Sequence, residues 1–142
     1  MNETMQYRYV VDGENFMSAG EASADVKRIL RQLGFDSTVI RRTAIAMYEG
    51  EINMVIHAKG GVADVEISDE KIVVVLKDEG PGIPDVELAM SEGYSTAPDQ
   101  IRALGFGAGM GLPNMKKYTD EMHIDTEVGV GTTVTLTICN QK

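Results

Sequence analysis

The spacing of apolar residues along the chain predicts two long helices near the N-terminus. Across residues 18–33 the apolar positions recur at helical spacing, and Gly34 follows as a typical helix stop. A second helix is predicted over residues 37–58, with Asp36 or Ser37 as its cap. Because apolar residues lie on both sides of this second helix, we expect much of it to be buried.

Strands are predicted where apolar residues alternate with polar ones, or run together between turn signals. The predicted strands cover residues 7–11, 63–68, 72–76, 122–128 and 132–139, and a short helix is predicted over residues 112–118. Tight turns link most neighbouring strands, so we expect antiparallel pairing. The expected fold class is α/β: a two-layer α/β sandwich with helices on one face of a mixed, mostly antiparallel sheet.

Composition narrows the classes of protein and of partner. The 142 residues fit a single domain, 1–142, and the net charge of −9 argues against nucleic acid or an anionic membrane as a partner. Cys139 is the only cysteine, so an internal disulfide is excluded. The first residues lack the features of a signal peptide, and no apolar run approaches the roughly 20 residues of a spanning helix. We therefore expect a cytoplasmic protein.

Two glycine-rich segments frame residues 83–104, a stretch without a consistent period. The first segment, Asp78-x-Gly80-x-Gly82, directly follows a predicted strand, and the second places glycine at 105, 107, 109 and 111. Glycine allows the backbone to adopt positive φ or to approach a ligand closely, and a short turn needs only one or two. The first candidate for a ligand between these segments is a phosphate chain.

Glu49 and Asn53 lie four residues apart on the second predicted helix, so they share one face, among isoleucines. A carboxylate and an amide in apolar surroundings need partners, and Arg42 is the only complementary residue that the helix offers. A metal ion or another ligand would satisfy both groups. Each motif alone also has a purely structural explanation. Glu49 and Asn53 could be a capped or solvated pair, Asp78-x-Gly80-x-Gly82 could form a turn, and Gly129-x-Gly131-Thr132 could form a hairpin turn.

Taken together and in this order, the four motifs resemble the ATP-binding Bergerat fold of the GHKL superfamily. DNA gyrase, Hsp90-type chaperones, sensor histidine kinases and MutL-type proteins share that fold. The short chain and the run Gly109-Met110-Gly111-Leu112-Pro113 look most like the serine kinases of bacterial anti-sigma factors, closest to the switch kinases of the stressosome branch. This resemblance covers nearly the whole chain.

The resemblance implies a role for each polar motif residue. Asn53 would ligate Mg²⁺, and Glu49 would be the general base that accepts the proton of an incoming hydroxyl group or of water. Asp78 would accept a hydrogen bond from the adenine amino group, with Thr132 in support. Gly80 and Gly82 would let the backbone pass beside the base. Gly107, Gly109 and Gly111 would surround the phosphates, under an ATP lid at about residues 83–110.

The implied function is that of an Mg-ATP-dependent serine/threonine protein kinase in a partner-switching pathway. Its partner would be an anti-sigma factor antagonist, a scaffold protein or a sigma factor-like regulator. A homodimer is also implied, with the first strand and first helix as its candidate interface. One departure from the family is that no arginine directly precedes the terminal Gly-x-Gly of the lid, where Arg102 is the nearest.

Three alternatives remain open. The protein could be an ATP-gated binding module for a regulator, with little catalysis. It could be the detached catalytic domain of a histidine kinase, which autophosphorylation of His57 or His123 would support. It could also be an α/β sandwich whose glycines form turns and bind no nucleotide.

Overall fold

The computed structural model describes residues 4–12, 20–58, 60–80, 82–83, 90 and 111–140 of the chain. These residues form a five-stranded sheet in the order β1-β2-β3-β5-β4. The strands are β1 (Met5–Asp12), β2 (Gly60–Ile67), β3 (Lys71–Asp78), β4 (Glu121–Glu127) and β5 (Gly131–Cys139). The helices are α1 (Glu21–Gln32), α2 (Ser37–Ala58) and α5 (Gly111–Lys117).

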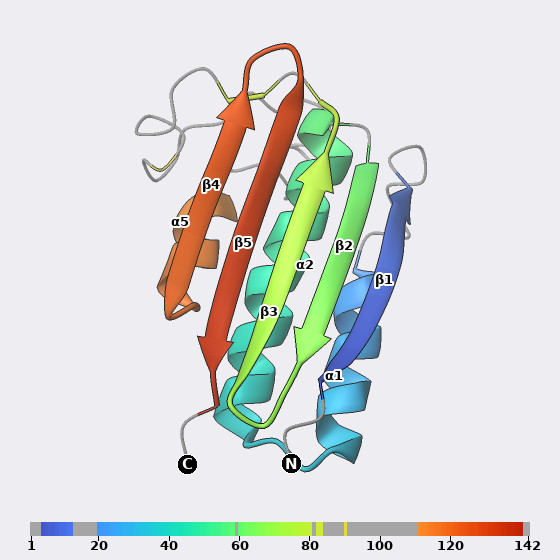
Figure 1. Ribbon diagram of the computed structural model, residues 1–142, viewed down its shortest axis with the longest axis vertical. Coiled ribbons are helices and arrows are strands. Elements are labelled where there is room, and N and C mark those ends of the chain that lie inside the picture. Colours follow the sequence, from blue (N-terminus) through green and yellow to red (C-terminus); the bar gives the residue numbers. More distant parts are fainter. Residues whose placement is uncertain are drawn as a thin grey trace, which may run out of the picture.

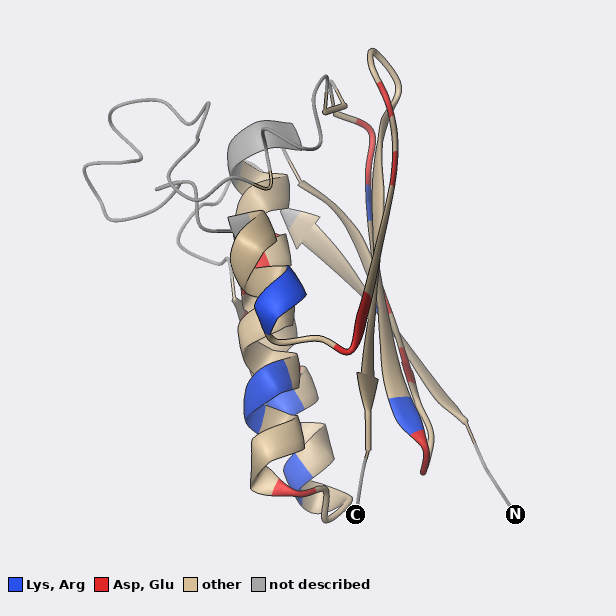
Figure 2. Cartoon of the chain, turned by 90° about the vertical axis from the view of Figure 1, so that its left-hand side faces the viewer, with Lys and Arg blue, Asp and Glu red and all other residues tan. Residues whose placement is uncertain are grey.

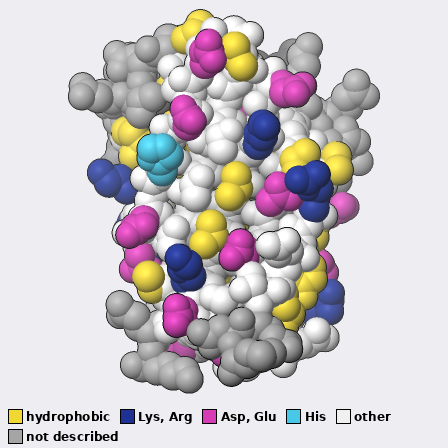
Figure 3. Space-filling view, in the orientation of Figure 1, with side chains coloured by type: hydrophobic (Ala, Val, Ile, Leu, Met, Phe, Trp, Pro, Cys, Tyr) yellow, Lys and Arg dark blue, Asp and Glu magenta, His cyan; other side chains and the backbone are white. Residues whose placement is uncertain are grey.

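The three described helices cover one face of the sheet, which gives two layers (Figures 1 and 2). All four strand pairings are antiparallel. The predicted two-layer α/β sandwich is therefore confirmed, and the described strands contain no parallel pair. The other face of the sheet carries acidic, basic and apolar side chains interspersed (Figure 3). On this face Arg8 of β1 pairs with Asp64 of β2, with 2.7 Å between Nε and Oδ1.

Helix α2 is the centre of the helical layer. It has the predicted bounds, and it contacts α1, α5 and four of the strands. Ala46 and Met47 are fully buried on it, and Met54 nearly so. A side-chain carbon added at Gly50 would collide with Leu76 of β3, so this glycine lets the helix approach the sheet closely. The predicted burial of the helix is confirmed.

The ends of the helices follow local rules that the sequence contains. Gly34 has a φ of +80° after α1, where Phe35 N donates to the Leu30 carbonyl and Gly34 N to the Arg31 carbonyl. Asp36, one of the two predicted caps, accepts a hydrogen bond from Thr38 N at 3.1 Å. Helix α1 begins at Glu21, later than the predicted residue 18.

Candidate functional site

Glu49 and Asn53 lie one turn apart on α2, and both are partly buried. Burial raises the pKa of the Glu49 carboxyl, and a hydrogen bond from the Asn114 side chain of α5 partly offsets this rise. The Asn114 Nδ2 to Glu49 Oε1 distance is 3.4 Å. Arg42, the partner suggested by the sequence, instead pairs with Asp120 at 3.2 Å. The described partner of Glu49 therefore comes from another helix.

The outer side of Glu49 borders a shallow groove between α1 and α2. The groove has a volume of about 420 Å³, and its lining includes Ser23, Lys27, Ile45 and Tyr48. Its lining is mostly apolar, and the groove is open to solvent. A polar group of another molecule could enter this groove and reach Glu49.

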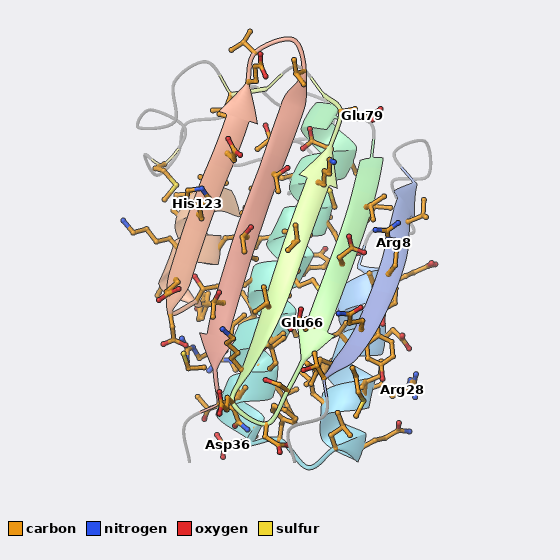
Figure 4. All side chains as sticks on the ribbon, in the orientation of Figure 1. Arg8, Arg28, Asp36, Glu66, Glu79 and His123 are labelled. Carbon is orange, nitrogen blue, oxygen red and sulfur yellow. The ribbon has the colours of Figure 1, made fainter. Side chains whose placement is uncertain are left out.

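Asp78 ends β3 and meets the beginning of β5. Its Oδ1 atom accepts hydrogen bonds from Gly80 N at 2.9 Å and from Thr132 N at 3.2 Å. The strand register pairs Asp78 with Thr132 directly. Because both bonds go to Oδ1, Oδ2 accepts none from the described residues. The carboxylate is thus held in one orientation with a second oxygen left for another donor. Glu79, the next residue, is labelled in Figure 4 at this end of β3.

The hydroxyl groups of Thr132 and Thr126 connect the Asp78 contact to the backbone next to Gly82. Thr126 Oγ1 lies 2.9 Å from Thr132 Oγ1, and it accepts a hydrogen bond from Ile83 N at 2.9 Å. Gly82 has a φ of +79°, and a side-chain carbon there would lie 2.6 Å from the Glu127 carbonyl oxygen. Only glycine fits this position without strain. Thr126 was missed by sequence reasoning because only the strand pairing brings it beside Thr132.

Gly61 of β2 lies where α2 packs against the end of β3. A side-chain carbon added there would lie 2.9 Å from Met54 Sδ of α2 and 3.2 Å from the Asp78 Cα atom of β3. Met54 follows Asn53 on α2, so the helix backbone around Asn53 lies near the end of β3. No hydrogen bond between described residues joins the Glu49 or Asn53 side chain to Asp78, so their common site stays a prediction.

Other predicted site residues are only partly described. Gly111 begins α5, whereas Gly107, Gly109 and Arg102 lie outside the described residues. Of the predicted lid, residues 83 and 90 are described, and both pack against the core. The His57 side chain also lies outside the described part of the chain. His123 is exposed on β4 (Figure 4).

Glu51 is a buried acid that sequence reasoning missed. It is 2% exposed, and its carboxylate accepts hydrogen bonds from the backbone of Gly20, Ala22 and Ser23 at 2.9, 3.3 and 2.7 Å. These amide groups open α1, where Gly20 supplies no side-chain cap. Glu51 is two residues from Glu49, so it faces the opposite side of α2. It therefore fixes α1, which forms one wall of the groove beside Glu49.

No helix in the described ranges is both long enough and apolar enough to cross a membrane.

Comparison with known proteins relates the chain to one family. Residues 40–142 match the family described as histidine kinase-, DNA gyrase B- and HSP90-like ATPase. The serine/threonine-protein kinase RsbT of Bacillus subtilis (strain 168) is 30% identical over 112 residues, which is 76% of this chain and 78% of that protein. An anti-sigma F factor of Bacillus licheniformis is 31% identical over 141 residues, with 94% and 88% covered.

A solved structure supports the same fold. The RsbU and RsbW domains of a Mycobacterium tuberculosis protein match with a TM-score of 0.64 and 19% sequence identity. The match covers 97% of this chain and 33% of that chain. At this identity the likeness concerns the fold alone.

Proposed function

The chain belongs to the histidine kinase-, DNA gyrase B- and HSP90-like ATPase family, and on that premise we propose that it is an Mg-ATP-dependent serine/threonine protein kinase of the anti-sigma regulatory type. Two of its relatives carry the names serine/threonine-protein kinase RsbT and anti-sigma F factor. The described core is continuous from β1 to β5, which supports a single domain over residues 1–142.

Adenine recognition is assigned to Asp78. The two backbone donors that hold Oδ1 leave Oδ2 for the adenine amino group. Thr132 supports the contact through its backbone N–H and the hydroxyl chain to Thr126. Gly80 and Gly82 are assigned to the backbone that passes beside the base. Gly107, Gly109 and Gly111 are assigned to the phosphates, under a lid at about residues 83–110.

Magnesium is assigned to Asn53. The described residues contain no group of three or more histidine, cysteine, aspartate or glutamate side chains that could hold a metal by itself. A metal at Asn53 would therefore need ligands from phosphates and water, which is the way Mg²⁺ binds beside nucleotides. The Asn53 side chain has no hydrogen bond to a described residue, so its amide oxygen can serve as a ligand. This donor set fits Mg²⁺.

Phosphoryl transfer is assigned to Glu49 as general base. The serine oxygen forms a bond to the γ-phosphorus, the bond to the β–γ bridging oxygen breaks, ADP leaves, and the hydroxyl proton passes to Glu49. A pKa raised by burial suits a base that acts near neutral pH. The observation that carries the proposal is this partly buried carboxylate, one turn from Asn53 and bordering a groove.

The test is transfer of label from γ-labelled ATP to a partner protein. Partners are first recovered by pull-down with and without ATP, and their phosphorylated residues are then mapped. We expect Glu49→Gln to lower transfer by about 100- to 10,000-fold while ATP binding by calorimetry persists, and Asp78→Asn to abolish ATP binding. Full transfer by Glu49→Gln would refute the kinase mechanism.

We further propose that the partner is an anti-sigma factor antagonist or a sigma factor-like regulator, and that phosphorylation switches partners by adding charge. A homodimer through β1 and α1 belongs to the same proposal, and β1 is an edge strand of the sheet. Sedimentation of the chain with and without ATP tests the dimer.

A second function is favoured by one observation in the sequence. Residues 105–108 read Gly-Phe-Gly-Ala, so no arginine directly precedes the terminal Gly-x-Gly to stabilise the transferring phosphoryl group. An ATP-gated regulator-binding module with little catalysis would need no such charge. Nucleotide-dependent partner binding, with ATP intact after long incubation, would support this second function over the first.

A further inference from the structure

Asn114 is the described residue whose side chain contacts the Glu49 carboxylate. Its Nδ2 atom lies 3.4 Å from Glu49 Oε1, and both side chains are partly buried. Neither the family motifs nor the assignments above use Asn114. The pair joins α5, which follows the second glycine segment, to the middle of α2.

We propose that Asn114 is a positioning residue for the base of the phosphoryl transfer reaction. Its N–H group holds Oε1 of Glu49, and this leaves Oε2 to accept the proton of the incoming hydroxyl group. The inference rests on the proposed function, because it assigns Asn114 a role only if Glu49 is the base. Asn114 itself touches none of the reacting atoms in this arrangement.

The backbone of Asn114 is held firmly enough for such a role. Leu112 and Met115 flank it on α5 and are 9% and 1% exposed in the core. Their burial fixes the rotation of α5, so the position of Asn114 is set by packing rather than by its own weak hydrogen bond. A side chain on a backbone fixed in this way can orient a partner at a lower entropic cost than one on a loop.

A second contact holds the other end of α5 against the same face of α2. Arg42 Nε donates to the Tyr118 carbonyl oxygen at 3.2 Å, and Arg42 also pairs with Asp120 at 3.2 Å. Arg42 and Glu49 are seven residues apart, which is two helical turns, so both face α5. The two helices are therefore joined at two points, and Glu49 is one of them.

The chemistry of an amide suits this position. An amide donor orients a carboxylate without a full opposite charge, so the carboxylate keeps more of its basicity than it would beside a lysine or arginine. Lys27 is the cation in the groove lining, and no ion pair joins it to Glu49 in the described structure. Asn114 thus supplies orientation while leaving Glu49 able to take a proton.

The test uses the full chain and measures turnover of γ-labelled ATP with Mg²⁺ and water as the acceptor. We expect Asn114→Leu to lower kcat by about 10- to 100-fold, with KM for ATP unchanged within about twofold. Asn114→Gln, which keeps the donor, should recover much of this loss. Lys116→Ala, at an exposed position of the same helix, is the matched control and should turn over like the wild type.

A double-mutant cycle separates positioning from general damage. In a Glu49→Gln background, Asn114→Leu should cost nothing further, because the base that it orients is gone. An equal loss in that background, or a wild-type kcat in Asn114→Leu, overturns the inference. Asn114→Ser repeats the test with a smaller residue if the leucine variant does not fold. Full turnover by Glu49→Gln alone instead refutes Glu49 as the base, and with it the proposed mechanism of phosphoryl transfer.

Discussion

Replacement of Glu51 by alanine should destabilise the protein severely, although the residue lies outside the proposed chemistry. The substitution removes a carboxylate that is 2% exposed and leaves three backbone N–H groups of α1 without an acceptor. Removal of a helix cap costs about 0.5–2 kcal/mol at exposed helix ends. Hydrogen bonds to a charged group contribute about 1.5–3 kcal/mol each.

Two of the three hydrogen bonds are short, from Gly20 N at 2.9 Å and Ser23 N at 2.7 Å, and the bond from Ala22 N at 3.3 Å adds less. The two short bonds alone predict a loss of about 3–6 kcal/mol from the free energy of unfolding. A domain of this size has a total of about 5–15 kcal/mol, so the variant should retain only part of its stability. Glu51→Gln keeps one oxygen acceptor and should lose less.

Urea unfolding followed by far-ultraviolet circular dichroism measures the effect, since the chain has no tryptophan. Glu21→Ala is the matched control, because Glu21 is an exposed acid in the first turn of the same helix. It should change the free energy of unfolding by no more than about 0.5 kcal/mol. A loss below about 1 kcal/mol in Glu51→Ala would refute the capping argument.

Three further predictions concern stability. The backbone hydrogen bond from Cys139 lowers the pKa of the Asp120 carboxyl, so the ionised carboxylate stabilises the fold at pH values above its unfolded pKa near 3.8. Asp120→Asn should therefore be less stable than the wild type in urea unfolding at pH 7, and the difference should vanish in acid. Burial raises the pKa of the Glu49 carboxyl, so its negative charge lowers the stability of the fold above pH 4.5. The Glu49→Gln variant should have a higher melting temperature than the wild type at pH 7 but not at pH 3, and equal melting temperatures at pH 7 would contradict this. Gly50→Ala should cost about 1–3 kcal/mol of unfolding free energy by collision with Leu76, whereas an unchanged urea midpoint would show that the packing yields freely.

The elements of this fold were predictable because each leaves a local pattern. Helix α2 has the predicted bounds, since its spacing, its Asp36 cap and the glycines after it all act within a few residues. The turn at Gly129 was likewise predictable, and the Val130 N to Glu127 carbonyl bond closes it. Local rules of this kind depend on neighbours in the sequence, which the sequence displays directly.

The contacts that complete the candidate site were not predictable, because they join residues distant in the sequence. Asn114 reaches Glu49 across 65 residues, and Glu51 reaches Ser23 across 28. Neither residue has a distinctive local pattern: Asn114 lies in a short helix, and Glu51 differs little from Glu49 in its surroundings. Only the packing of α1 and α5 against different sides of α2 gives the two acids different partners, the backbone of α1 for Glu51 and the Asn114 side chain of α5 for Glu49.

The pairing of β3 with β5 has a consequence for the order of events during translation. Asp78 is synthesised long before Thr132, yet Thr132 supplies one of the two donors that orient its carboxylate. A nascent chain that still holds β5 inside the ribosome would contain the aspartate without its correct orientation. With Asp78 in its proposed role as the adenine contact, affinity for the nucleotide should arise late in synthesis, when β5 inserts between β3 and β4.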